Sequence, residues 1–351
     1  MGNNGKIFHL QMNLIAKLHY KSIIRFLIKR KFFFISAIVV IWFLSYLMLP
    51  LNITEENASF EISAGKSLGE ITDQLVEIKV LQDSFRFKLL TFIFGKAEKL
   101  KKGHYQLSKD ITPYELLEML ATGRESLFSL TLIEGQTYHD LVATLDNNKH
   151  IKKTLNTYNK AEVLKAIRAN TDYIEGIFFP DSYYFYKNSN DIDILKNAHN
   201  VMLNKLSFLW ENRTDDLPYT NMYDALIMAS IIEKEVLIKE EAPMVAGVFI
   251  NRLNIGMPLQ SDPTVIFGMK ENFDGNLRRK DLKKDTSHNT YTRRGLPPTP
   301  IAYPSHSSLE AALNPATTDA LYFVAMGDGR HYFSRTLKEH NWAVRKYQKK
   351  K

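Results

Sequence analysis

The sequence predicts an α+β protein with a single N-terminal transmembrane helix, then a small α/β module and a larger mixed α+β domain. Three observations predict this organisation. An uncharged apolar run lies near the N-terminus, short extended segments precede helix-start signals, and the C-terminal half alternates longer helices with polar, turn-rich stretches. A chain of 351 residues with 45% apolar content is long enough for one to three domains.

The basic excess of the chain is concentrated at its N-terminus. Seven Lys and Arg residues lie within residues 1–31, and the first acidic residue is Glu55. The other 39 basic residues nearly balance the 38 acidic ones, so the net charge of +8 belongs to this tail. We therefore expect no nucleic-acid partner.

Residues 32–51 read FFFISAIVVIWFLSYLMLPL and contain no charge. About twenty apolar residues suffice to span a bilayer as a helix. The positive-inside rule then predicts a cytoplasmic tail over residues 1–31 and an extracytoplasmic body after Leu51. A cleaved signal peptide is the alternative, but the run exceeds a usual signal-peptide core and no small-x-small cleavage site follows it. We predict a retained, single-pass anchor in contact with membrane lipid.

The sequence contains no cysteine. Disulfides and thiol catalysis are therefore excluded, and an ordinary hydrophobic core must hold the exported body together. This composition fits a bacterial cell envelope better than a eukaryotic secreted setting. The predicted location is the bacterial inner (cytoplasmic) membrane, with the body on the periplasmic or extracytoplasmic side.

Three helix-start signals follow the apolar run. Each places a hydroxyl three residues before an acid, as in a capping box, and apolar residues then recur at helical spacing. Extended segments at residues 60–62, 105–107 and 128–133 precede them. We predict repeated strand–turn–helix units, the first two forming a module over residues 55–125. The three signals are Ser67-x-x-Glu70, Thr112-x-x-Glu115 and Thr137-x-x-Asp140.

Residues 126–351 are predicted to form the second domain. After an aromatic stretch over residues 173–186, we expect helices at 222–238 and 242–253. Polar loops follow, and long loops inside a compact domain are commonly functional. Residues 321–333 are predicted to end the domain as a hairpin.

Motif inspection leaves carboxylate chemistry as the candidate activity. The chain has no HExxH motif, no zinc-ligand spacing among its ten histidines, no phosphate-binding glycine loop and no GxSxG elbow. We therefore expect neither a metal nor a cofactor. The best candidates are Glu233 and Glu235, at the end of the predicted helix 222–238.

Helix geometry separates these two glutamates. At about 100° per residue they point roughly 200° apart, so they cannot share one site. Glu235 lies on the side of the larger apolar residues, where desolvation would raise the pKa of its carboxyl and make it a proton donor. Lys239 is expected to occupy the next equivalent position on that side. The alternative is a Glu-Lys-Glu surface turn that merely ends a core helix.

Several long blocks closely resemble the YceG-like endolytic murein transglycosylases. They occur in the family's order and, with a LysM-like module next to the anchor, cover about residues 55–345. The resemblance implies a YceG-like catalytic domain over residues 126–351, with Glu235 as the catalytic residue. The blocks are IEGIFFPDSYYF, MASIIEKE, VAGVFINRLNIGMPLQSDPTVIFGM, NTYTRRGLPPTPIAYP and HYF with EHN.

The implied activity is cleavage of the β-1,4 bond between N-acetylmuramic acid and N-acetylglucosamine in peptidoglycan glycan strands. Lytic transglycosylases need one catalytic carboxyl, because the muramic C6 hydroxyl supplies the nucleophile and a 1,6-anhydro end results. The resemblance also implies action on nascent strands beside penicillin-binding glycan synthases, with elongation or division proteins as further partners. A muramidase-type hydrolase and a non-catalytic, peptidoglycan-binding scaffold remain as alternatives.

Polar and aromatic residues around Glu235 are candidate sugar contacts, because amides and hydroxyls suit N-acetyl and hydroxyl groups. For Asn251 and Arg252, helix capping and a surface ion pair are the alternative, and for Phe178 and Phe179 core packing is favoured over stacking on sugars. Two further aspartates beside prolines either form turns or provide a second carboxylate; they are Asp181 and Asp262. The candidate contacts are Asn251, Arg252, Gln260, Ser261, Asp262, Thr264, Tyr291 and Glu175.

Overall fold

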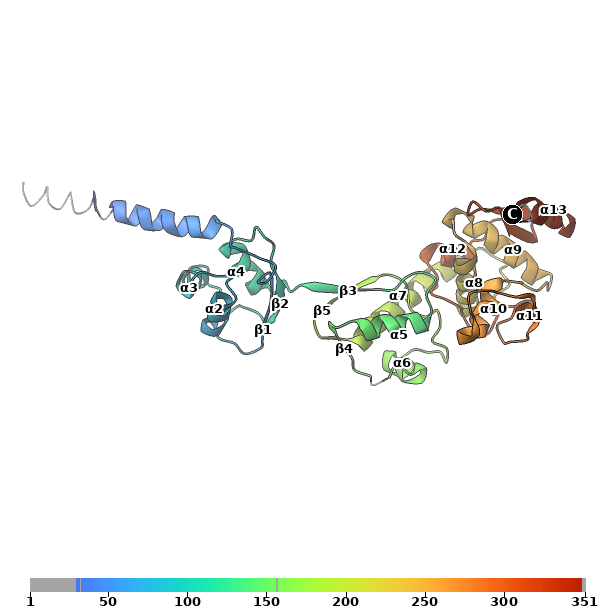
Figure 1. Cartoon of the computed structure of the whole chain (residues 1–351), viewed down its shortest axis with the longest axis horizontal. Helices are drawn as coiled ribbons and strands as arrows, with labels where there is room; N and C mark the ends of the chain where they lie inside the picture. Colours follow the sequence, from blue (N-terminus) through green and yellow to red (C-terminus); the bar gives the residue numbers. More distant parts are fainter. Residues whose placement is uncertain (1–29, 32, 156, 349–351) are drawn as a thin grey trace, which may run out of the picture. The chain divides into compact units, whose positions relative to one another are not determined.

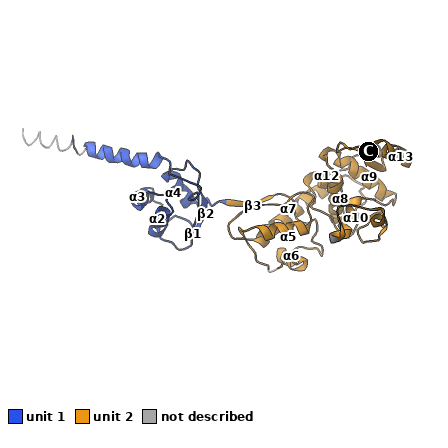
Figure 2. Cartoon of the chain, in the orientation of Figure 1, with its two compact units in different colours: residues 1–126 blue, residues 127–351 orange. Residues whose placement is uncertain are grey.

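The computed structural model describes residues 30–348 apart from 32 and 156. The chain divides into two compact units, residues 1–126 and 127–351 (Figure 2). Both contain helices and short strands, so the predicted α+β class is confirmed (Figure 1). Nearly all of the predicted basic tail, residues 1–29, lies outside the described residues.

In the described part of unit 1, a helix over residues 33–48 precedes a small α/β module. Within the part of the chain that the structure describes, no helix is long and apolar enough to cross a membrane. The module pairs its two strands antiparallel, with Phe60 opposite Tyr105. Its elements are β1 (Ser59–Ile62), α2 (Leu68–Glu77), α3 (Ser84–Ile93), β2 (Gly103–Gln106) and α4 (Pro113–Thr122).

The predicted helix starts of the module are confirmed in detail. Ser67 and Glu70 form a reciprocal capping box at α2, and Thr112 and Glu115 form another at α4. Each box satisfies backbone amides that the first helical turn cannot pair internally. The helices then bury their apolar faces in a core that includes Leu75, Phe87, Leu90, Tyr105, Leu116 and Leu120.

The first half of unit 2 combines small two-stranded sheets with helices. The strand expected at residues 128–133 forms, but it pairs with the aromatic strand β5, from Leu127↔Tyr186 to Thr131↔Ser182. At the third predicted helix start, Asp140 accepts from both N and Oγ of Thr137. The elements are β3 (Leu127–Thr131), α5 (Tyr138–Asn147), β4 (Ile151–Lys152), α6 (Lys160–Ile167), β5 (Ser182–Tyr186), β6 (Ser189–Asn190) and α7 (Asp191–Glu211).

The second half of unit 2 is built around one buried helix, α8 (Met222–Glu235). It packs against α7, α9 (Ala242–Asn254), α10 (Asp262–Met269) and α12 (His306–Leu313). Every residue from Ala225 to Ile232 is buried, so the helix is apolar all round as an interior helix must be. Asn221 caps its start through the amides of Tyr223 and Asp224.

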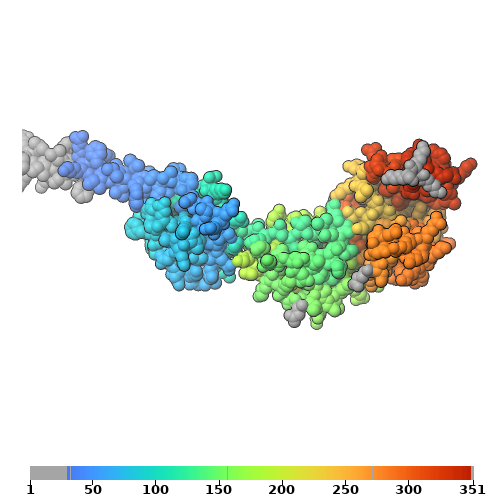
Figure 3. Space-filling model, viewed as in Figure 1, coloured from blue at the N-terminus to red at the C-terminus, as the bar shows by residue number. Residues whose placement is uncertain are grey.

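The remaining elements of unit 2 surround α8. The predicted terminal hairpin is confirmed as β7 and β8, with Phe323 opposite Phe333. In Figure 3 the atoms of α10 and α11 (orange) and those of the C-terminal elements (red) form neighbouring parts of the surface. These elements are η1 (Lys239–Glu241), α9 (Ala242–Asn254), α10 (Asp262–Met269), η2 (Lys270–Asn272), α11 (Arg279–Lys283), α12 (His306–Leu313), β7 (Tyr322–Ala325), β8 (His331–Ser334) and α13 (Leu337–Tyr347).

Candidate active site

Glu235 is the last residue of α8, and the backbone turns extended at Val236. The helix is therefore three residues shorter than the sequence predicts. The prediction that Lys239 continues the face of Glu235 is wrong, because Lys239 begins η1 and its Nζ pairs with Glu134 Oε2 at 2.7 Å. A carboxyl at the end of a buried helix is held by a rigid element while its head group stays within reach of neighbouring loops.

The segment that enters α10 supplies the partner of this carboxyl. Ser261 Oγ donates to Glu235 Oε1 across 2.5 Å, and Ser261 itself is only 1% exposed. Ser261 occupies the N-cap position of α10, but its hydroxyl is used on Glu235 and makes no cap bond. The serine hydroxyl therefore binds Glu235 in place of the backbone amides that an N-cap serine usually binds.

A network of hydroxyls fixes Ser261 in turn. Its backbone amide donates to Thr290 Oγ at 3.0 Å, and the hydroxyls of Thr264 and Thr290 lie 2.8 Å apart. Thr264 Oγ also donates to the Ser261 carbonyl at 2.6 Å, and Gln260 N donates to the Thr290 carbonyl at 3.1 Å. Because Thr264 and Thr290 are buried, this network holds the backbone of Ser261 in place at the start of α10.

The surroundings of Glu235 make its carboxyl a weaker acid than an ordinary glutamate. Burial raises the pKa of its carboxyl to about 7, and the negative charge of Asp262 adds to the rise. The hydrogen bond from Ser261 and the charge of Arg252 act in the opposite direction and favour the carboxylate. A carboxyl with a pKa near neutrality can both donate and accept a proton at the same pH.

Asp262 and Tyr291 form a second pair beside Glu235. Tyr291 OH donates to Asp262 Oδ1 across 2.5 Å, and Asp262 is exposed while Tyr291 is half-buried. Burial, followed by this hydrogen bond, raises the pKa of Tyr291 well above its ordinary value, so the phenol stays protonated. Gln260 is also exposed, with a left-handed backbone at φ +52°.

Asn251 and Arg252 of α9 use their donors on the protein itself. Asn251 Nδ2 donates to the carbonyls of Thr318 and Ala320. Arg252 is 6% exposed, and its Nε and Nη1 donate to the carbonyls of Leu321 and Leu259. Arg252 is therefore a buried cation that ties the loops on both sides to α9, where surface capping and ion pairing had been the alternative.

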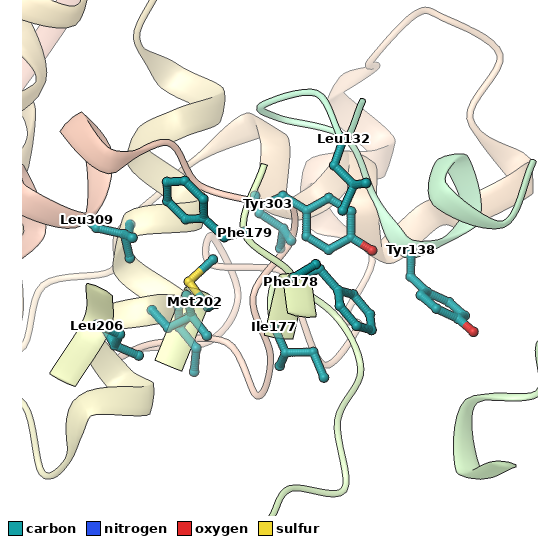
Figure 4. Close-up of a cluster of buried hydrophobic side chains, with 14 of the residues drawn as sticks. Leu132, Tyr138, Ile177, Phe178, Phe179, Met202, Leu206, Tyr303 and Leu309 are labelled. Atoms are coloured by element: carbon teal, nitrogen blue, oxygen red, sulfur yellow. The ribbon is translucent and has the colours of Figure 1, made fainter. Parts of the chain in front are cut away.

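Glu175 lies in the interior, 7% exposed, and no described hydrogen bond or ion pair joins it to Glu235. Its Oε1 accepts from the amide of Tyr138 at the start of α5, and burial raises the pKa of its carboxyl to about 7. Phe178 and Phe179 pack in the core beside Met202 and Tyr303, as the favoured interpretation of the sequence expected (Figure 4).

The side chains of Glu233 and Glu235 lie on different faces of α8 and bind different partners, as helix geometry predicts. Its Oε2 accepts from Ser305 N, Ser305 Oγ and Ser308 Oγ, at 2.8, 2.5 and 2.7 Å. The carboxylate thus caps the start of α12 and fastens it to α8. Neither serine was singled out from the sequence, because a Ser-x-x-Ser pair near a helix start has many other uses.

A cavity of about 310 Å³ lies beside the hydroxyl network. Its walls include Thr290, His288, Arg293 and Arg294, from the loop between α11 and α12. Thr290 thus both binds Ser261 and lines the cavity. Among the described residues, no group of three or more acidic, histidine or cysteine side chains could hold a metal ion.

Known proteins are similar in sequence to this chain over most of its length. It is 31% identical over 314 residues to the endolytic murein transglycosylase of Bacillus subtilis, covering 84% of this chain and 86% of that protein. The endolytic murein transglycosylase of Streptococcus pneumoniae strain R6 is 26% identical over 328 residues, and the match spans 59% of its length.

A crystal structure of a putative YceG-like protein from Listeria monocytogenes has the same fold. It is 29% identical, with a TM-score of 0.52, and the match covers 81% of this chain and 97% of that one. The sequence model of the YceG-like family matches residues 60–346, which include nearly all of the module and the whole Glu235 network. The chain belongs to the YceG-like family.

Proposed function

We propose that this chain is an endolytic lytic transglycosylase that cleaves peptidoglycan glycan strands, with Glu235 as its catalytic acid and base. The observation that carries the proposal is the single carboxyl of pKa about 7 at the end of α8, held by Ser261. Family membership and the names of the Bacillus and Streptococcus relatives, both endolytic murein transglycosylases, support the substrate.

The mechanism follows from one group acting twice. Protonated Glu235 gives its proton to the oxygen that bridges C1 of N-acetylmuramic acid and C4 of N-acetylglucosamine, and the C1–O bond breaks. The C6 hydroxyl of the same muramic residue then closes onto C1, and carboxylate Glu235 takes the hydroxyl proton. One 1,6-anhydromuramyl end and one free C4 hydroxyl result, Glu235 is protonated again, and no water is consumed.

Neighbouring residues support the two protonation states of Glu235. Burial favours the neutral acid needed first, while Ser261 and Arg252 stabilise the carboxylate formed after proton donation. Opposing influences of this kind place the pKa near the working pH, where both transfers are efficient. The hydroxyl of Ser261 also orients Oε1 of Glu235, and Thr264 and Thr290 hold the backbone of Ser261 in place.

Glycan contacts are proposed at the accessible residues beside Glu235, namely Gln260, Asp262 and Tyr291. Their amide, carboxylate and phenol groups suit sugar hydroxyl and N-acetyl groups. Asn251, Arg252, Ser261 and Thr264 would act by holding these loops, because their polar groups are bonded within the protein. A contact from Glu175 would require its carboxyl to leave the Tyr138 amide.

A muramidase-type hydrolase is the second candidate, and Asp262 is the observation that favours it. This exposed carboxylate is close enough to raise the pKa of Glu235, so it could position a water molecule. Canonical glycoside hydrolysis uses two carboxyl groups in this way. The hydrogen bond from Tyr291 occupies one oxygen of Asp262 and favours a binding role instead.

We further propose that residues 32–51 anchor the protein in the bacterial inner membrane, with the tail cytoplasmic and the body extracytoplasmic. The uncharged run, the preceding basic residues and the exposed apolar side chains of helix 33–48 support this topology. The β1–α2–α3–β2 order of unit 1 supports a LysM-like, glycan-binding module. Nascent strands beside glycan synthases and elongation or division proteins are the proposed setting.

Mass analysis of the fragments released from purified peptidoglycan tests the activity. The full chain in detergent should release fragments that end in 1,6-anhydromuramic acid. The Glu235→Gln variant should release at least about 10²-fold less, because an amide cannot donate and reclaim a proton. Anhydro ends formed equally by both proteins would contradict the proposed role of Glu235.

A further inference from the structure

Helix α3 of unit 1 is apolar on two opposite faces. Its buried face, Phe87, Leu90 and Thr91, belongs to the module core. The other face exposes large apolar side chains at positions i, i+4, i+7 and i+8, which form one continuous strip on a helix. We call this strip the α3 stripe: Phe85, Leu89, Phe92 and Ile93, which are 68%, 36%, 66% and 57% exposed.

Three phenylalanine or isoleucine side chains more than half exposed on one strip are unusual in a soluble surface, where such clusters mark interaction sites. The charged residues that α3 itself contributes beside the α3 stripe are both basic. α3 contains no acidic residue, and Arg86 and Lys88 project on its two sides. Arg86 pairs with the N-cap residue Asp83, and Lys88 lies 3.4 Å from Asp73 of α2. Long basic side chains on either side of apolar ones suit a boundary between apolar and anionic surroundings.

The same helix is joined to the predicted anchor. The Arg86 guanidinium lies 4.8 Å from the ring centroid of Tyr46 and 5.8 Å from that of Trp42, both in helix 33–48. Phe43, Tyr46 and Leu47 pack against the module core, and Leu51 N donates to the Ile111 carbonyl at 2.8 Å. The module therefore follows the anchor without a free linker, and α3 lies beside the end of that helix (Figure 1).

Helix 33–48 itself exposes apolar side chains along its length before this junction. Ile35, Ile38 and Ile41 are 59%, 65% and 66% exposed. A cavity of about 780 Å³ opens where the helix meets the module, and Trp42, Tyr46 and Arg86 line it. Arg86, which lies next to Phe85 of the α3 stripe in the sequence, thus lines the same cavity as Trp42 and Tyr46 of the anchor helix.

We propose that the α3 stripe docks on the lipid bilayer at the foot of the anchor, on the extracytoplasmic side. Its apolar side chains would enter the boundary between headgroups and acyl chains, with Arg86 and Lys88 toward anionic headgroups. This inference rests on the membrane anchoring proposed above. The contacts of Arg86 with Trp42 and Tyr46 of the anchor helix, and the lack of acidic residues in α3, favour lipid over a second copy or another protein. Docking fixes the orientation of the module on the membrane surface.

The absence of native cysteine allows single-site labelling of the full chain. Phe92→Cys, Ile38→Cys and Lys109→Cys variants carry an environment-sensitive fluorophore and are reconstituted in vesicles that contain anionic lipid with brominated acyl chains. Position 92 should emit at shorter wavelength, at a depth of about 5–10 Å in the headgroup–acyl boundary, and be quenched by brominated lipid. Position 38 should be quenched as the anchor control, and exposed position 109 should stay in water.

The outcomes separate docking from anchoring. A quenched label at 38 with a water-exposed label at 92 overturns the docking and leaves the anchor intact. An unquenched label at 38 overturns the anchor and the docking with it. A label at 92 that is shielded from water yet untouched by brominated lipid shows a protein on the α3 stripe, which also contradicts lipid docking. Because Phe92 is mostly exposed, its replacement leaves the module core unchanged.

Discussion

The hydroxyl of Ser261 donates to Oε1 of Glu235 across 2.5 Å and so joins the start of α10 to the end of α8. The serine gives up its helix-capping role for this contact. The bond favours the carboxylate form of Glu235 against the effect of burial.

Replacing Ser261 by Ala should therefore raise the pKa of Glu235 further and loosen its orientation. We expect turnover to fall by about 10- to 100-fold, as small misplacements of catalytic groups do. The high-pH limb of the pH–rate profile should move to higher pH, since the acid form persists longer. Ser261→Thr keeps the hydroxyl and should keep the profile. A Ser261→Ala enzyme with the original midpoint would show that the serine does not act through Glu235.

The two glutamates of α8 should separate activity from stability. Glu235→Gln should abolish most cleavage while the protein remains folded, because the amide has nearly the same size. Glu233→Gln keeps an acceptor for Ser305 and Ser308 but loses the charge, so we expect about 1–3 kcal/mol lower stability with cleavage retained. Activity and thermal melting of both variants check this. A Glu233 variant that melts normally but does not cleave would reverse the assignment.

How far the sequence predicts the site depends on the range of each interaction. The opposite directions of Glu233 and Glu235 follow from helix periodicity alone, and the structure confirms them. The end of α8 was predicted three residues too late, because Val236 and Leu237 continue the apolar pattern while the backbone turns extended. The local pattern of apolar residues does not determine the residue at which a helix ends when tertiary packing decides it.

The partners of these residues are the part that the sequence does not reveal. Ser261 reaches Glu235 across 26 positions, and Arg252 reaches the Leu321 carbonyl across 69. Such contacts depend on how helices and loops pack, and polar side chains have many alternative partners. Capping boxes at Ser67 and Thr112 were predictable because both members lie within one turn.

Glu175 should make the stability of unit 2 depend on pH. Burial raises the pKa of its carboxyl to about 7 in the folded protein, against about 4.5 when unfolded. The neutral form of Glu175 therefore makes its full contribution to the stability of the folded protein below about pH 4.5. This contribution is lost as the pH rises through about 7. Glu175→Gln lacks the titration and keeps an acceptor for Tyr138.

Calorimetric melting at pH 5 and pH 8 measures this effect. Relative to Glu175→Gln, the native protein should lose up to roughly 3 kcal/mol between the two conditions, at about 1.4 kcal/mol per pKa unit. Glu235 titrates in both proteins, so its effect on stability cancels when the native protein is compared with Glu175→Gln. An equal difference between the two proteins at both pH values would contradict a buried, titrating Glu175.

The proposed topology predicts the behaviour of a fusion. A reporter that is active only outside the cytoplasm, joined after Lys351, should be active, and the protein should sediment with membranes. The basic residues before the uncharged run are the reason. Placing acidic residues at Lys29, Arg30 and Lys31 should reduce the correctly oriented fraction. A soluble product processed near residue 51 would contradict the retained anchor.

In the proposed mechanism Glu235 acts alone and the sugar provides its own nucleophile. Cleavage of glycan strands in water labelled with heavy oxygen distinguishes this mechanism from hydrolysis. We expect unlabelled muramyl ends, each one water lighter than a hydrolysis product, for the native enzyme and for Asp181→Asn and Asp262→Asn alike. Reducing muramyl ends that carry the label, and that disappear when Asp262 is replaced, would contradict it and identify a two-carboxylate hydrolase.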